Sequence, residues 1–238
     1  MTSINPRETL DRALQEVLDE VLVLGSMVEE AIQASVEALK QRDFEAAQNI
    51  YFADQNINAK HFEIEDTCIV LIATQQPMAK DLRLLAAVLE IVTELERIGD
   101  YAKGIARINI IMGDEPLVKP LIDIPRMSEL GLDMLRRALI AFVSGDVDAA
   151  RSIPKEDDMI DSLYNQVYRE LVTYMIDDTS TIDRANYLLW AAHNLERMAD
   201  RVTNICERTI YMVTGEMREL DRTDDEMAKL ERTYKDWK

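Results

Sequence analysis

The sequence is poor in the residues that mark several protein classes. Its 238 residues include only 2 Cys, 2 His, 7 Gly and 6 Pro, and aromatic residues make up 6%. A disulfide-stabilised scaffold needs more cysteine, and an all-β fold needs more glycine and proline for its many turns. With two histidines, the sequence shows no nucleophile–base constellation. We therefore expect neither of these folds, and we expect a protein that is not an enzyme.

Positive charge and long apolar runs are also scarce. Acidic residues number 45 against 27 basic ones, which gives a net charge of −18 and argues against a nucleic-acid binder. Glu90 and Glu94 interrupt an apolar stretch, and no run reaches the ~20 residues that span a bilayer. Residues 1–7 lack the pattern of a signal peptide. We expect a cytoplasmic protein in which Cys68 and Cys206 are buried free thiols.

Apolar residues make up 47% of the chain, and their spacing of three and four residues predicts helices almost throughout. Three prolines within residues 114–125 exclude a helix there, and this stretch is interpreted as a linker. Glycines and capping residues divide the remainder. The predicted helices cover residues 6–41, 44–74, 77–112, 126–144, 146–176 and 181–214.

The two halves of the chain resemble each other. Residues 95–100 (LERIGD) match residues 195–200 (LERMAD), and residues 54–58 (DQNIN) match residues 157–161 (DDMID) in the same order. Two ordered matches indicate an internal repeat. We therefore predict an all-α fold of two tandem antiparallel three-helix bundles. The predicted divisions are a first repeat at 1–113, a linker at 114–125, a second repeat at 126–215 and a charged tail at 216–238.

An acidic stripe follows the last predicted helix of the second repeat. At about 100° per residue, four oxygen-bearing side chains fall on one narrow face that borders the apolar stripe. Two more carboxylates share a face of the preceding helix, and counting residues from the connecting turn places both groups at the same height. Six candidate metal ligands result: Asp157, Asp161, Glu196, Asp200, Asn204 and Glu207.

Such a cluster of carboxylates repels itself unless basic residues or cations offset the charge. Oxygen donors favour hard or borderline cations, so we expect divalent or trivalent ions: iron, zinc, manganese or magnesium. The alternative is that the acidic residues form ordinary solvated or salt-bridged surface. A di-metal enzyme of the ferritin type uses Glu-x-x-His from two helices. This chain has only the reverse order, from His193 to Glu196, so we disfavour that enzyme.

The first repeat provides a comparison within the same chain. Its equivalent acidic residues are Asp54, Glu96 and Asp100. Asn58, Gly104 and Arg107 replace the other three ligands, and Lys103 lies on the same face. We expect this site to be metal-free, with internal ion pairs replacing the metal charge, or weaker. Arg97 and Arg197 are expected to brace carboxylates of the two stripes; direct phosphate binding by them is disfavoured by the negative surroundings.

These motifs also carry a resemblance to a known family. Residues 75–83 (QQPMAKDLR) precede LERIGD, and LERMAD precedes Asn204 and Glu207. On these residues the sequence resembles the PhoU family, regulators of bacterial phosphate uptake and signalling, over about residues 8–215. The resemblance implies two three-helix bundles side by side, with metal clusters on their acidic motifs. It extends to all six ligands of the second repeat and only to three in the first.

The resemblance also implies a function and partners. Members lack catalysis and are cytoplasmic. They restrain the phosphate-starvation response, together with the ATPase subunit of the phosphate ABC transporter and a phosphate-sensing histidine kinase. They are often homodimers, and they meet the membrane only through those partners. The alternative function is a structural helical scaffold without metal, whose acidity serves solubility.

Overall fold

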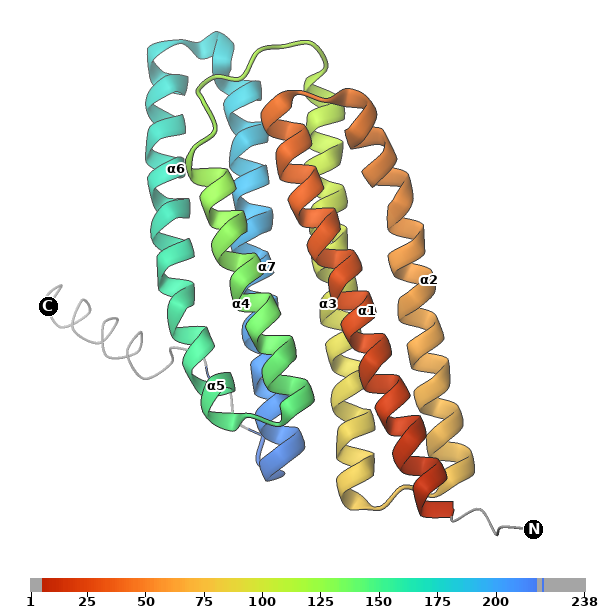
Figure 1. The fold of residues 1–238 in the computed structure, drawn as a ribbon. Helices are drawn as coiled ribbons and strands as arrows, with labels where there is room; N and C mark the ends of the chain where they lie inside the picture. Colours follow the sequence, from red (N-terminus) through yellow and green to blue (C-terminus); the bar gives the residue numbers. More distant parts are fainter. Residues whose placement is uncertain (1–5, 218–219, 221–238) are drawn as a thin grey trace, which may run out of the picture.

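The computed structural model describes residues 6–217 and 220, and these form helices joined by short connections (Figure 1). No strand occurs among these residues. The helices are α1 (Pro6–Gln41), α2 (Phe44–Gln75), α3 (Ala79–Met112), α4 (Asp123–Ser144), α5 (Val147–Ser152), η1 (Ile153–Glu156), α6 (Asp157–Asp177), η2 (Thr179–Thr181) and α7 (Ile182–Thr214).

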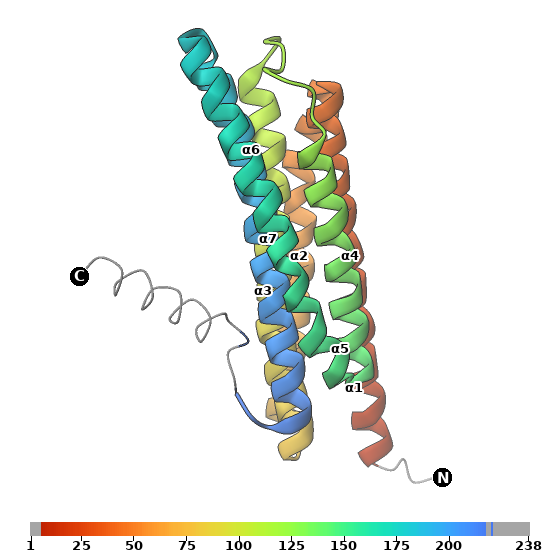
Figure 2. The same cartoon turned by 90° about the vertical axis from the view of Figure 1, so that its left-hand side faces the viewer.

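The helices form two three-helix bundles that lie side by side. Helices α1, α2 and α3 make the first bundle, and α4, α6 and α7 make the second, with α5 and η1 leading into α6 (Figure 1). Helices α3 and α7 pack against each other where the bundles meet. Figure 2 shows α1 and α4 on one side of the molecule and α3 and α7 on the other. The all-α fold of two repeats that the sequence predicts is confirmed.

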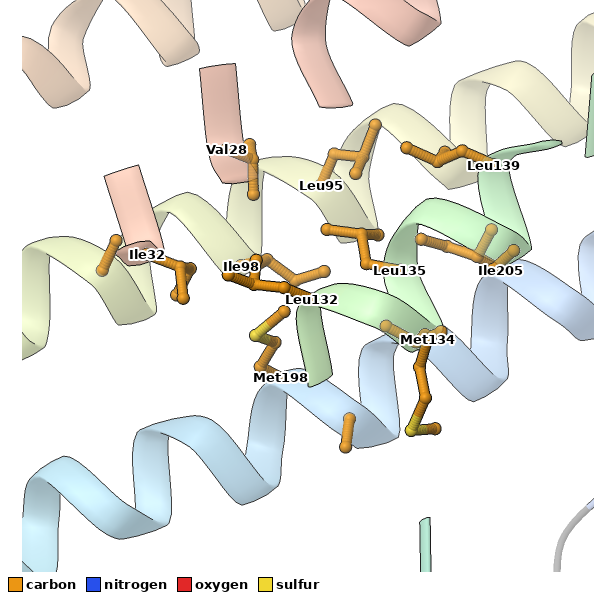
Figure 3. Close-up of a cluster of buried hydrophobic side chains, with 14 of the residues drawn as sticks. Val28, Ile32, Leu95, Ile98, Leu132, Met134, Leu135, Leu139, Met198 and Ile205 are labelled. Carbon is orange, nitrogen blue, oxygen red and sulfur yellow. The ribbon is translucent and has the colours of Figure 1, made fainter. Parts of the chain in front are cut away.

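One hydrophobic core runs through both bundles. Side chains from α1, α3, α4 and α7 meet at the junction (Figure 3), and all belong to a single buried cluster. Ile98 and Met198 are fully buried there, at matching positions of the two repeat motifs. A Cβ at Gly25 would lie 2.4 Å from Leu139 Cδ1, so a glycine allows α1 and α4 to pack closely at this point.

Three predicted boundaries differ from the structure. The predicted helix 146–176 is broken, because Pro154 lies in the 3-10 turn η1 and cannot continue an α-helix. Helix α4 begins at Asp123, so the end of the predicted linker is helical and Pro125 lies in the first turn of α4. Helix α3 begins at Ala79 rather than at residue 77.

Other local predictions are confirmed. Gly113, Gly145 and Gly215 follow their helices with positive φ, as expected of helix-ending glycines. Cys68 and Cys206 are free and buried, and burial raises the pKa of each thiol to about 12. Within the described part of the chain, no helix is long and apolar enough to span a membrane. Most of the predicted tail, 216–238, lies outside the described residues.

Candidate functional site

The break before α6 positions one end of the acidic face. Asp157 is the first residue of α6 and is buried, and it faces the C-terminal half of α7 across a pocket of about 330 Å³. Four of the six expected ligands line this pocket, together with two arginines and a threonine. The lining residues are Asp157, Arg197, Asp200, Arg201, Thr203, Asn204 and Glu207.

The remaining two expected ligands, Asp161 and Glu196, do not line the pocket but lie beside it. The pKa of Glu196 is raised by burial, then by the neighbouring charge of Asp200, and in smaller measure by that of Asp161. His193 opposes this rise, with its Nδ1 3.2 Å from Glu196 Oε2. That oxygen is buried and accepts no hydrogen bond from the described residues. Glu196 is therefore a crowded carboxylate that a cation would stabilise.

Several oxygens of the second-repeat site already have partners. Arg197 Nη1 donates to Asp200 Oδ2 at 2.8 Å, which is the bracing contact expected from the sequence spacing. The backbone N–H of Leu220 donates to Glu207 Oε1 at 2.6 Å. A metal bound here would therefore compete with Arg197 for Asp200 and with the backbone of Leu220 for Glu207.

The amide of Asn204 points to the other repeat. Its Nδ2 donates to Oε2 of Glu94 on α3 at 3.1 Å. Arg201 also contacts Glu94, with Nη1 3.3 Å from Oε2, and Arg97 donates to Oε1 at 2.6 Å. Arg201 Nε in turn donates to the hydroxyl of Tyr101 at 3.3 Å. Arg97 thus forms its hydrogen bond with Glu94, and through its charge it opposes the rise that burial causes in the pKa of Glu96 in its own stripe.

This Glu94 network was missed by the sequence analysis. Glu94 is only 7% exposed, although carboxylates are rarely buried without a partner. The available signal was its position inside an otherwise apolar stretch of α3, which places it on a buried helix face. Its partners could not be read from the sequence, because they come from α7. The network joins α3 of the first bundle to the acidic face of α7.

In the first repeat a lysine occupies the centre of the acidic face. Lys103 Nζ lies 2.7 Å from Asp54 Oδ2 and 3.8 Å from Asp100 Oδ1. Asn58 Nδ2 also donates to Asp54 Oδ2, at 3.0 Å. The pKa of Glu96 is raised, first by burial and then by the charge of Asp100. Arg107 is exposed and forms no ion pair with the described residues.

The residues of the first repeat therefore do not fit a metal, because an ammonium group already neutralises Asp54. The second repeat differs in its donors. Its face carries carboxylate and amide oxygens, which fit a hard or borderline cation, and its cationic side chains are the guanidinium groups of Arg197 and Arg201. As the side chains are placed, no group of three or more His, Cys, Asp or Glu among the described residues is close enough to hold a metal ion. Binding in the second repeat would require side-chain rotation that brings its carboxylates together.

Both repeats of the sequence match a known protein family. A family model described as the PhoU domain matches residues 21–108 and again residues 124–209. The chain is 38% identical over 208 residues to the phosphate-specific transport system accessory protein PhoU homolog of Aquifex aeolicus, covering 87% of this chain and 94% of that protein. It is 34% identical over 203 residues to the phosphate-specific transport system accessory protein PhoU of Escherichia coli, covering 85% and 84% of the two chains.

Two solved structures are similar over almost their whole length. The crystal structure of PhoU from Pseudomonas aeruginosa aligns with a TM-score of 0.81 at 35% identity, covering 87% of this chain and 99% of that chain. The phosphate transport system regulatory protein PhoU from Streptococcus pneumoniae aligns with a TM-score of 0.82 at 33% identity, covering 88% and 99%. Each match of the family model spans most of one bundle.

Proposed function

This chain belongs to the PhoU family, and on that premise we propose that it is a non-enzymatic regulator of phosphate transport. The observation that carries the proposal is the match of the family model to both repeats, at residues 21–108 and 124–209. The relatives are named accessory proteins of the phosphate-specific transport system. A bundle with an acidic face and no nucleophile–base pair suits an adaptor better than a catalyst.

The finer proposal is negative regulation of phosphate uptake and of the phosphate-starvation response. The protein acts in the cytoplasm, as a homodimer. It works with the ATPase subunit of the phosphate ABC transporter and with a phosphate-sensing histidine kinase. Its contact with the membrane is made through those partners.

A pull-down tests this assignment. The tagged full-length protein is recovered from cells grown at high and at low phosphate, and the bound proteins are scored for the transporter ATPase and the sensor kinase. We expect both partners from phosphate-replete cells, because restraint of the response is needed there. A tagged helical bundle of similar charge serves as the control bait. Recovery of neither partner at either phosphate level would contradict the adaptor role.

We further propose that the second repeat binds a divalent or trivalent cation through its acidic face. The oxygen donors and the crowded carboxylate of Glu196 support this proposal. The ligands would come from the set defined above on α6 and α7. A bound cation would offset the charge that now raises the pKa of Glu196, and would tie α6 to α7. The first repeat has Lys103 in the corresponding place.

Metal analysis of two double variants tests this site. Protein purified without chelator is expected to carry bound metal, and Glu196→Ala with Asp200→Ala should reduce that metal at least tenfold, because two adjacent carboxylates are lost. The matched control is Glu96→Ala with Asp100→Ala at the equivalent positions of the first repeat, which should leave the metal content unchanged. Equal amounts of bound metal in both double variants and the parent would contradict this site, and no metal in any of the three would favour the metal-free scaffold.

A further inference from the structure

A groove between α2 and α3 exposes large apolar side chains. It has a volume of about 730 Å³ and is lined by Phe62, Glu65, Asp66, Ile69, Ala86, Leu89, Glu90 and Thr93. Phe62 is 62% exposed and Ile69 is 55% exposed. Large apolar side chains grouped in this way usually mark a surface that another segment covers. We refer to this surface as the α2–α3 groove.

The charge of the α2–α3 groove restricts its occupant. Three carboxylates, those of Glu65, Asp66 and Glu90, line it, and none of the lining residues is basic. An anionic lipid surface would be repelled, and so would the same groove of a second copy. The groove suits an amphipathic segment that has apolar residues on one face and basic residues beside them.

The chain contains such a segment outside the described residues. In residues 227–238 the apolar side chains recur at three- and four-residue spacing, which is the spacing of anchors that bind helical grooves. These apolar residues are Met227, Leu230, Tyr234 and Trp237. The same stretch has four basic residues, Lys229, Arg232, Lys235 and Lys238, against the two acidic residues Glu231 and Asp236. It is thus a basic stretch in a chain of net charge −18.

The last described residues are held on a part of α7 that contacts the α2–α3 groove. Leu220 is held on α7 by its hydrogen bond to Glu207, and the sulfur of Met217 accepts a hydrogen bond from Arg208 Nη1 at 3.0 Å. The other terminal nitrogen of Arg208, Nη2, lies 3.8 Å from Oε2 of Glu90. Glu90 lines the groove. Leu220 is therefore bonded to Glu207, the neighbour in sequence of Arg208, and the side chain of Arg208 extends to the groove.

Six residues separate Leu220 from the basic stretch. Residues 221–226 can span up to about 20 Å when extended. The path to the groove starts at Leu220, which is bonded to Glu207, and Arg208 next to Glu207 contacts Glu90 of the groove. From the apolar surface, the acidic lining and this reach, we propose that residues 227–238 of the same chain bind the α2–α3 groove. Tethering raises the local concentration of the segment, so it would compete with any external helix for this surface.

The fluorescence of Trp237 tests this proposal in the full-length protein. The chain has two tryptophans, and Trp190→Phe leaves Trp237 as the single reporter. In that background we expect blue-shifted emission and protection from acrylamide quenching. Phe62→Glu should weaken the docking of residues 227–238 by about tenfold or more, because it removes a large apolar contact. The emission of Trp237 should then shift to longer wavelength. Asp66→Lys should give a smaller shift in the same direction.

Matched substitutions elsewhere serve as controls. Ile140→Glu changes an equally exposed apolar residue of α4, and Glu129→Lys reverses an exposed charge on the same helix; neither should alter Trp237. Emission typical of a solvent-exposed tryptophan in the Trp190→Phe background would overturn the proposal. So would a blue shift that persists in Phe62→Glu, or one that disappears on dilution, because the latter assigns the groove to a second copy. No transport partner is present in this experiment, so its outcome is independent of the proposed regulation of phosphate uptake.

Discussion

Replacing Glu94 with Ala is expected to lower the free energy of unfolding by about 2–4 kcal/mol, because it leaves partly buried cationic and amide groups without their acceptor. Arg201 is 16% exposed at its side chain, and it contacts the same carboxylate that accepts the hydrogen bond from Asn204. Since both partners belong to α7, the loss weakens the junction between the two bundles. Urea unfolding of the parent and the variant at neutral pH measures the difference.

Glu90 provides the matched control for this substitution. It lies one turn earlier on α3, its side chain is 55% exposed, and its ion pair with Arg208 is long at 3.8 Å. Glu90→Ala should therefore change the free energy of unfolding by less than about 1 kcal/mol. If Glu94→Ala and Glu90→Ala destabilise the protein equally, the network does not join the bundles energetically. Combining Glu94→Ala with Arg201→Met should recover part of the loss, because the stranded cation is then also removed.

Replacing Lys103 with Met should lower the free energy of unfolding by about 1–3 kcal/mol in the presence of chelator. Asp54 is only 5% exposed at its side chain, and Lys103 is the cation that neutralises it. The effect is smaller than for a fully buried pair, because the Lys103 side chain is 32% exposed. Without the ammonium, Asp54 loses its paired cation while the charges of Glu96 and Asp100 remain near it. Added divalent metal is expected to restore most of the lost stability, because it can replace the ammonium.

The comparison of the variant with the parent isolates this site. Metal bound at the second repeat would stabilise both proteins alike. The informative quantity is therefore the difference in the free energy of unfolding between parent and variant, measured with and without metal. Lys40→Met is the control, since its pairing with Glu37 joins two half-exposed side chains. The free energy of unfolding of Lys40→Met should differ little from that of the parent, and metal should not change this difference. If metal leaves the stability difference between Lys103→Met and the parent unchanged, the view that Lys103 takes the place of a metal ion is contradicted.

Most of the fold could be predicted from the sequence, because helical periodicity and repeats are local signals. The spacing of apolar residues identified α1, α2 and α7 almost to their ends. Matching residues 95–100 to residues 195–200 established the duplication, and the structure places Ile98 and Met198 at the same junction. The break at Pro154 was missed although proline is a strong local signal, because the apolar pattern continues on both sides of it.

The candidate site was predictable only in part. Spacing along α6 and α7 correctly places Asp157, Asp200, Asn204 and Glu207 around one pocket. Spacing predicted the contact of Arg197 with Asp200 within α7, but it could not show the partners that come from other helices or from the chain after α7. Asn204 donates to Glu94 of α3, and Glu207 accepts from the backbone of Leu220.

The sequence by itself determined the helices, their duplication and the positions of the acidic stripes, because each depends on residue spacing along one helix or on comparison of the two halves. Only the tertiary structure decided how the two bundles are joined. The packing of α3 against α7 brings Glu94 to Arg201 and Asn204, residues more than a hundred positions apart. A buried carboxylate needs such partners because leaving water is costly for a charge, and only the packed bundles bring them within reach.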